Sequence, residues 1–209
     1  MSTQSVLERS HPGRRAALKR EILARALACF NEQGIEATTI EAIRVACETS
    51  VGAIYHHFGN KDGLIAALFF CALDDQAHRL SQRLSDARGP QDGVHAMVLS
   101  YVEWVVAEPE LARFMYQARS FVAKGPHAQA LADRNRTRNR HVLSWFTQRD
   151  DGQLLSRCPP ELLPSLIVGP AESYCRAWLA GRVRTSPQTH GPALAAAAWG
   201  SIQAVAAMG

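Results

Sequence analysis

Residues 49–64 read TSVGAIYHHFGNKDGL, a mixture that a plain core helix does not require. Ser50 is a favourable N-cap and Gly59 a favourable stop, so the stretch predicts a short helix over 50–58. Gly52 falls in the first turn of that helix, where a missing side chain lets free backbone N–H groups approach another molecule. The stretch therefore indicates a recognition element and not packing alone.

A second short helix is expected directly before this one, over about 39–47. Thr39 can cap it, and Glu41 lies in its first turn. Only Glu48 and Thr49 separate the two helices. This is the spacing of a helix-turn-helix, a motif whose second helix lies in the major groove of DNA.

The remainder of the chain also has helical periodicity, punctuated by Gly and Pro, and no alternating β-branched run predicts a strand. The predicted class is all-α, with about nine helices. Beyond the two short helices, we expect helices over about 14–33, from Asn60 onward, over 92–107, 109–121 and 127–148, from Pro164 to near Gly181, and from Gly191 to the end.

Composition adds limits to this interpretation. The 209 residues are 47% hydrophobic and 20% charged, an ordinary globular balance. Five scattered cysteines show no metal-ligand spacing, no apolar signal core opens the chain, and no run is long enough for a membrane span. We therefore expect a cytoplasmic protein with no cofactor, no metal and no membrane association. Its expected organisation is a mobile arm (1–12), a helix-turn-helix domain (13–60) and a larger helical domain (61–209).

Net charge does not locate a nucleic-acid site. The chain has a net charge of +4. Residues 1–64 contain eight Lys and Arg against seven Asp and Glu, whereas residues 111–157 contain nine against three. The basic excess lies in the middle of the chain, away from the helix-turn-helix, so the motif carries the DNA-binding prediction.

The stretch TTIEAIRVACETSVGAIYHHFGNKDGL, residues 38–64, resembles the DNA-binding signature of the tetracycline-repressor (TetR) family of bacterial regulators. The resemblance extends over about residues 14–68. It implies a homodimer in which a ligand-binding domain controls two DNA-reading heads. It also implies that some residues touch phosphates and others face bases. The first group is Thr39, Tyr55, His56 and Lys61, and the second is Ser50, Val51 and Ala53, with Gly52 allowing close approach.

The turn departs from the family pattern. Members usually have Ala-Gly-Val there, and this chain has Cys47, Glu48 and Thr49. A non-glycine residue at a position that needs positive φ is strained by roughly 1 kcal/mol. The neighbouring His56-His57 pair could suggest a metal site, but adjacent residues on a helix point about 100° apart. Metal binding is therefore disfavoured.

The stretch LADRNRTRNRHVLSWF, residues 131–146, places Asn135 and Arg138 on an otherwise apolar stripe. Either Arg138 pairs with a carboxylate such as Glu103, or both residues are polar anchors in an apolar ligand cavity. A second nucleic-acid site is less favoured, because no aromatic residues are interleaved. The expected ligand-binding set is Met97, Tyr101, Trp104, Phe114, Met115, Asn135, Arg138, Trp145 and Tyr174, and each of these could equally be core. The expected effector is mostly hydrophobic, with or without an anionic group.

The last two helices predict a dimer interface. SLIVGPAESYCRAWLAGR and PALAAAAWGSIQAVAAM are apolar or small around most of their circumference. One side of such a helix packs on its own domain, and a second apolar side favours a partner. Internal packing of both helices is the alternative.

The sequence therefore predicts a ligand-responsive transcriptional regulator, most often a repressor in this family, that binds a palindromic operator. The alternative is a helical small-molecule-binding protein or enzyme with a non-functional helix-turn-helix. No sequence motif of a metalloprotease, serine hydrolase or phosphate-binding loop is present. We therefore expect no enzymatic activity.

Overall fold

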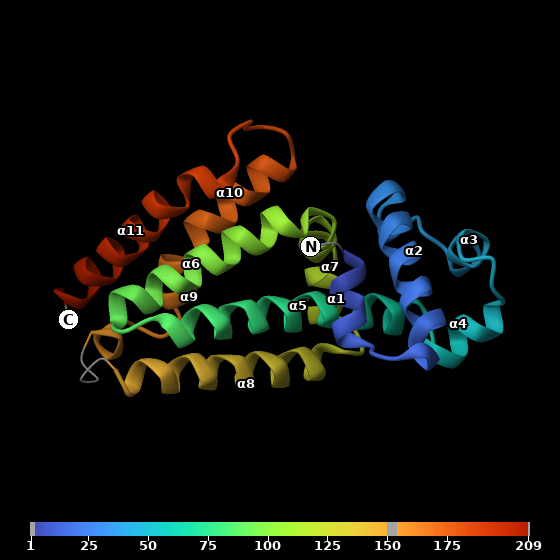
Figure 1. The fold of residues 1–209 in the computed structure, drawn as a ribbon, viewed down its shortest axis with the longest axis horizontal. Coiled ribbons are helices and arrows are strands. Elements are labelled where there is room, and N and C mark those ends of the chain that lie inside the picture. Colours follow the sequence, from blue (N-terminus) through green and yellow to red (C-terminus); the bar gives the residue numbers. More distant parts are fainter. Residues whose placement is uncertain (1–2, 150–153, 209) are drawn as a thin grey trace. The chain divides into compact units, whose positions relative to one another are not determined.

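The computed structural model describes residues 3–149 and 154–208, and within them the chain is helical with no strand (Figure 1). This confirms the all-α prediction, although the described residues form eleven α-helices and not about nine. The helices are α1 (Thr3–Ser10), α2 (Ala17–Gln33), α3 (Ile40–Ala46), α4 (Val51–Phe58), α5 (Lys61–Asp86), α6 (Pro90–Ala107), α7 (Pro109–Lys124), α8 (Ala128–Thr147), α9 (Leu163–Ile167), α10 (Gly169–Leu179) and α11 (Pro187–Ala206).

The helices form two compact units. The first lies within residues 1–75 and 108–135, and the second within 76–107 and 136–209. These units do not follow the expected boundary at residue 60. Phe30 of α2 stacks on Phe114 of α7 with ring centroids 5.5 Å apart, so α7 joins the first unit although it lies far away in sequence. Contacts of this kind are not visible in local periodicity.

The first residues form a packed helix and not the expected arm. Val6 and Leu7 of α1 are fully buried, and Arg9 Nη2 lies 2.6 Å from Asp75 Oδ1 of α5. The expectation failed because two adjacent apolar residues in a polar segment give too weak a pattern to predict burial. Within the first unit, α1 packs against α2 and α5 contributes the partner of Arg9.

The two short helices α3 and α4 belong to the helix-turn-helix region, residues 39–61, hereafter called the reading motif. Each of them buries one isoleucine. Ile43 of α3 and Ile54 of α4 are both fully buried, together with Ile22 and Phe30 of α2. Helices of seven and eight residues are marginal in water on their own. Burial of each isoleucine contributes about 1.5–3 kcal/mol. Since α3 packs against both α2 and α4, tertiary packing sets the positions of the two short helices.

The second unit is organised around α6 and α11, which pack along each other. Val98 and Val102 of α6 and Ala198 and Ile202 of α11 are buried. A side chain added at Gly191 would meet Leu99 Cδ2 at 3.1 Å, so the glycine permits the close approach of these helices. Among the described residues, no helix has the length and apolar character needed to cross a membrane.

Candidate nucleic-acid interface

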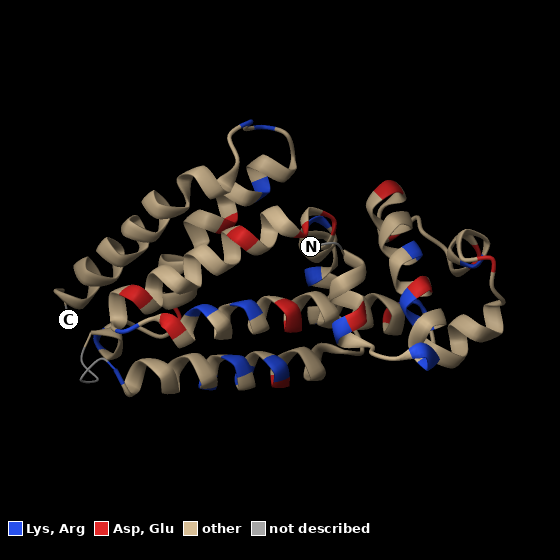
Figure 2. Cartoon of the chain, viewed as in Figure 1, with Lys and Arg blue, Asp and Glu red and all other residues tan. Residues whose placement is uncertain are grey.

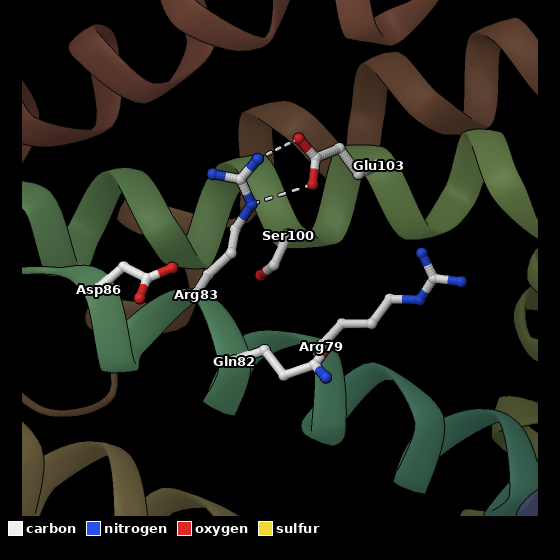
Figure 3. Close-up of a pocket in the computed structure, with 6 residues that line it drawn as sticks. All are labelled: Arg79, Gln82, Arg83, Asp86, Ser100 and Glu103. Atoms are coloured by element: carbon white, nitrogen blue, oxygen red, sulfur yellow. Dashed lines mark hydrogen bonds and ion pairs between the residues drawn. The ribbon is translucent and has the colours of Figure 1, made fainter.

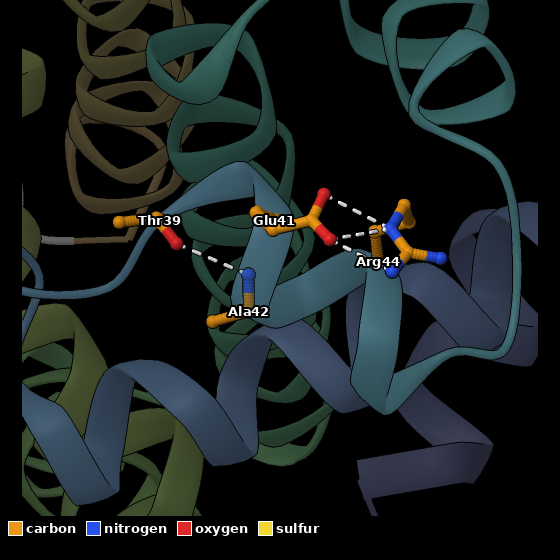
Figure 4. Close-up of polar contacts among 4 residues, drawn as sticks. All are labelled: Thr39, Glu41, Ala42 and Arg44. Atoms are coloured by element: carbon orange, nitrogen blue, oxygen red, sulfur yellow. Dashed lines mark hydrogen bonds and ion pairs between the residues drawn. The ribbon is translucent and has the colours of Figure 1, made fainter.

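Both helices of the reading motif begin at side-chain caps, as the sequence predicts. Thr39 Oγ1 accepts a hydrogen bond from the Ala42 N–H at 3.0 Å, and Ser50 Oγ accepts one from the Ala53 N–H at 3.1 Å (Figure 4 shows the first). A hydroxyl that accepts a bond can still donate its own proton. Each hydroxyl can therefore cap its helix and donate to a phosphate or base at the same time.

The turn between α3 and α4 has a positive φ at Glu48, the position where members of the family that the sequence resembles usually have glycine. Glu48 has φ 51°, and it is the one non-glycine residue with positive φ among residues 3–149 and 154–208. Its N–H donates to the Val45 carbonyl at 3.2 Å, and the Thr49 N–H donates to the Arg44 carbonyl at 3.3 Å. These two bonds form a Schellman motif, whose left-handed position is usually glycine. Glu48 therefore occupies a strained conformation.

One face of α4 is exposed. Gly52 and His56 are exposed, and the side chain of Tyr55 is 47% exposed. A Cβ at Gly52 would find only Ser50 Oγ within 4 Å, at 3.8 Å, so packing within the chain does not require glycine there. Ile54 points inward as expected and is fully buried. Val51 and Ala53 are partly exposed on either side of Gly52.

The two histidines of α4 lie close together without a further metal ligand. Their ring centroids are 5.3 Å apart. Partial burial, with His56 and Lys19 nearby, lowers the pKa of His57 from its usual value. In the described parts of the chain, no group of three or more His, Cys, Asp and Glu side chains could hold a metal ion.

Lys61 has a structural contact that the sequence did not reveal. Its Nζ donates to the Glu36 carbonyl at 3.0 Å and so ties the loop before α3 to the start of α5. An ammonium group has three N–H donors, so two remain for a phosphate. The same helix start is capped by Asn60, whose Oδ1 accepts from the Gly63 N–H at 2.8 Å. A Cβ at Gly63 would lie 2.0 Å from the Phe58 carbonyl oxygen, which explains the glycine in the Asn-Lys-Asp-Gly sequence.

Arg44 and Glu41 of α3 form an ion pair close to the exposed side of the helix-turn-helix (Figure 4). The sequence did not reveal this pair. Arg44 Nε lies 2.9 Å from both carboxylate oxygens of Glu41, and Nη2 lies 2.7 Å from Oε1. The hydrogen bonds from Arg44 lower the pKa of Glu41, and Glu41 raises the pKa of Arg44. The pair offsets a carboxylate that would otherwise repel DNA. Its i, i+3 spacing is a signal that sequence inspection could have used.

The second unit contains a polar hollow of about 400 Å³ (Figure 3). Its lining contains none of the nine residues expected to bind a ligand. The lining residues are Arg79, Gln82, Arg83 and Asp86 of α5, and Ser100 and Glu103 of α6. The first four are spaced i, i+3, i+4 and i+7, a helical pattern that could have identified them as one face.

The expected ligand-binding residues have varied locations. Trp104 and Phe114 are fully buried core residues. Trp145 Nε1 donates to the Leu84 carbonyl at 2.9 Å, and the Tyr174 hydroxyl donates to the Thr185 carbonyl at 3.1 Å, so both polar groups have partners within the second unit. Asn135 belongs to the first unit and Arg138 to the second. The carboxylate of Glu103, considered as a partner of Arg138, is bound by Arg83.

Comparison with known proteins identifies the motif. The model of the family described as "Bacterial regulatory proteins, tetR family" matches residues 22–68. The HTH-type transcriptional repressor AcnR of Corynebacterium glutamicum is 29% identical over 177 residues, which cover 83% of this chain and 85% of that protein. The HTH-type transcriptional repressor Rv1474c of Mycobacterium tuberculosis is 35% identical over 101 residues, 47% of this chain and 51% of its own length.

Solved structures share the fold over almost the whole chain. A TetR family transcription regulator from Marinobacter aquaeolei VT8 has a TM-score of 0.75 at 20% identity and covers 90% of this chain and 96% of its own. The fatty acid degradation regulator FadR from Bacillus halodurans has a TM-score of 0.69 at 14% identity, with 90% and 97% covered. At these identities the likeness establishes the fold, and the match to the N-terminal family model identifies the reading motif.

Proposed function

Since this chain belongs to the tetR family of bacterial regulatory proteins and is a DNA-binding regulator and not an enzyme, we propose that it represses transcription by binding a palindromic operator as a homodimer. Two relatives, AcnR and Rv1474c, are named transcriptional repressors, which supports repression over activation. The protein acts in the cytoplasm, where bacterial operator DNA is found.

The exposed face of α4 is the observation that carries this proposal. Gly52, Tyr55 and His56 are exposed on a helix whose opposite side is held by Ile54. In a helix-turn-helix this face enters the major groove, and the first helix crosses the backbone. We assign phosphate contacts to Thr39, Tyr55, His56 and Lys61, and close backbone approach to Gly52.

Base contacts in this assignment are few. Ser50 can donate a hydrogen bond, whereas Val51 and Ala53 can offer only apolar contact, for example to a thymine methyl group. Part of the specificity then comes from the shape and deformability of the operator. We expect the selected sites to share base steps at positions that no side chain touches.

Dimerisation is assigned to α10 and α11. Residues 187–206 of α11 contain no Lys, Arg, Asp or Glu, as Figure 2 shows along the whole helix. From residue 193 to residue 206 its exposed positions are small except for Gln203: Ala193, Ala196, Ala197, Gly200 and Ala204. An uncharged face of small residues in water favours close packing with an identical helix across a two-fold axis.

The effector is assigned to the second unit. A mostly hydrophobic effector is expected from the aromatic residues of the sequence, but the polar lining of the hollow does not favour one. The proposal therefore retains a small-molecule effector and leaves its hydrophobic character aside.

Selection from a random DNA duplex pool at near-physiological salt tests the proposal. We expect enrichment of a palindrome whose half-site centres lie about one helical turn, or a multiple of it, apart. Tyr55→Ala protein, shown to be folded and dimeric, serves as the matched control and should enrich the same palindrome more weakly. Failure of the folded, dimeric wild-type protein to enrich any sequence would contradict the proposal.

A further inference from the structure

Arg44 of α3 lies in a part of the chain that has little positive charge. It is the only lysine or arginine in the sequence between Arg25 and Lys61. The same interval contains four acidic residues, Glu32, Glu36, Glu41 and Glu48. Binding to DNA depends strongly on the neutralisation of phosphate charge. The position of this single guanidinium group is therefore important for the affinity of the reading motif.

The ion pair of Arg44 and Glu41 lies on the solvent-facing side of α3. The side chain of Glu41 is 63% exposed and that of Arg44 is 35% exposed. Val45, the next residue along the helix, is 58% exposed. Along the chain the pair lies between Thr39 and Ser50, the two capping residues with assigned DNA contacts. Since the first helix of a helix-turn-helix crosses the DNA backbone, a side chain on this side of α3 can reach the duplex.

The ion pair uses one edge of the guanidinium group. Arg44 Nε lies 2.9 Å from both carboxylate oxygens of Glu41, and Nη2 lies 2.7 Å from Oε1. Within the described part of the chain, Glu41 is the one partner of the Arg44 side chain. The second N–H of Nη2 and both N–H groups of Nη1 are therefore available as donors. Figure 4 shows the third nitrogen of the group on the side away from Glu41. The outer edge, formed by Nη1 and Nη2, is a second fork that can bind two acceptor atoms at once.

Folding stability is a weak reason for this pair. An exposed ion pair on a helix contributes little to stability, because water screens both charges. The pair does, however, hold a long side chain in one arrangement before DNA is bound. A guanidinium group that is already oriented loses less conformational freedom when it binds a partner. Glu41 therefore has two opposing effects on DNA binding, since it orients Arg44 and it also carries a negative charge.

We propose that Arg44 binds the operator with the outer edge of its guanidinium group and that Glu41 is its positioning residue. The ligand is a pair of acceptor atoms on DNA, either two oxygens of a phosphate or O6 and N7 of a guanine, because both match a bidentate fork. The inference rests on the proposed function, since it takes the protein to bind operator DNA. It adds a charged contact from α3 to the few contacts assigned to α4.

Fluorescence anisotropy titration of the selected duplex with folded, dimeric protein tests the role of Arg44. Arg44→Gln should weaken binding by about tenfold. Arg44→Lys should lose about as much although it keeps the charge, because an ammonium group cannot form the fork. Arg113→Gln is the matched control and should bind normally, since Arg113 pairs with Glu110 at the same i, i+3 spacing on α7. Circular dichroism of every variant checks that the helices are intact.

For Glu41 the two effects predict opposite signs. Glu41→Gln removes a negative charge, and charge alone predicts tighter binding to DNA. A positioning role predicts binding that is weaker by about threefold to tenfold, because the guanidinium group loses its support. In the Arg44→Gln background the same change should no longer weaken binding, so the two substitutions should be non-additive. A purely structural ion pair would not produce this dependence on Arg44.

The Arg44→Gln variant also distinguishes a phosphate from a guanine. With a phosphate as the ligand, the variant weakens all duplexes to a similar extent and lowers the slope of log affinity against log salt by about one unit per site. With a guanine as the ligand, the loss is confined to duplexes that have guanine at one position of each half-site, and selection at that position is relaxed. Either outcome supports the inference.

Two results would overturn the inference. The first is binding by Arg44→Gln or Arg44→Lys that equals that of the wild type, and the second is binding by Glu41→Gln that is as tight as that of the wild type or tighter. Wild-type protein is titrated in parallel. Normal wild-type binding with unchanged binding by the variants would remove this inference alone, whereas absence of wild-type binding to any duplex would remove the proposed repressor function as well.

Discussion

The reading motif and the polar hollow gather their residues in different ways. The motif draws all its assigned contacts from residues 39–61, which follow one another along the chain. The hollow combines one face of α5 with two residues of α6. Local spacing was enough to identify the first, whereas the second depends on which helices pack together. The assigned DNA contacts can therefore be found in local sequence, whereas the lining of the hollow is brought together only by tertiary structure.

The largest expected effect concerns Tyr55 in the reading motif. Because its side chain is 47% exposed, Tyr55→Ala should leave the thermal midpoint almost unchanged and weaken operator binding by about tenfold to a hundredfold. Fluorescence anisotropy with the selected duplex measures the affinity. Phe121→Ala, at a residue 37% exposed on α7, is the control and should bind normally. Normal binding by Tyr55→Ala would show that this face does not read DNA.

Two glycines should respond oppositely to the same substitution. A Cβ at Gly93 would lie 2.4 Å from Trp145 Cζ3 and 2.8 Å from Phe146, so Gly93→Ala should cost about 1–3 kcal/mol of unfolding free energy. Gly52→Ala should instead gain up to about 1 kcal/mol, since the site is open and alanine favours helix.

Urea denaturation measures both effects, and operator binding distinguishes their causes. Gly52→Ala should bind DNA more weakly although it is more stable, because the added methyl group would occupy space needed by the duplex. Should it bind DNA as well as the wild type, the close approach assigned to Gly52 would be wrong.

The turn gives a smaller effect. Glu48→Gly removes a side chain from a residue at φ 51° and should stabilise the protein by about 1 kcal/mol. Glu48→Ala retains a Cβ, removes the charge and serves as the control, which should not gain this stability. Equal denaturation midpoints for Glu48→Gly and the wild type would mean that the Schellman turn tolerates glutamate without strain.

The smallest expected effect is at Lys61. Lys61→Ala should weaken binding to all duplexes to a similar extent and lower the slope of log affinity against log salt by about one unit per site. Lys124→Ala, an exposed lysine at the end of α7, is the control. If the slope is the same in the Lys61 variant and the wild type, the contact with the Glu36 carbonyl is the whole role of this lysine.

The outcome for individual residues shows the limits of sequence reasoning. Cap residues such as Thr39 and Ser50 were predictable, because a cap acts within three residues of its own position. Trp104 was considered for a ligand cavity and lies in the core, since an aromatic residue on a helix gives the same pattern in both cases. The bond from Lys61 to Glu36 was not predictable, because it joins segments 25 residues apart.

The sequence by itself determined the helical class and the helix-turn-helix, because each depends on hydrogen bonds and periodicity within a few residues, and its resemblance to a known family implied the positive φ at Glu48. Tertiary structure alone decided that α1 is packed, that α7 joins the first unit, and that Arg83 of α5 pairs with Glu103 of α6. Those outcomes depend on which apolar faces bury each other. Many faces of similar composition compete in an all-helical chain, and only the complete packing selects among them.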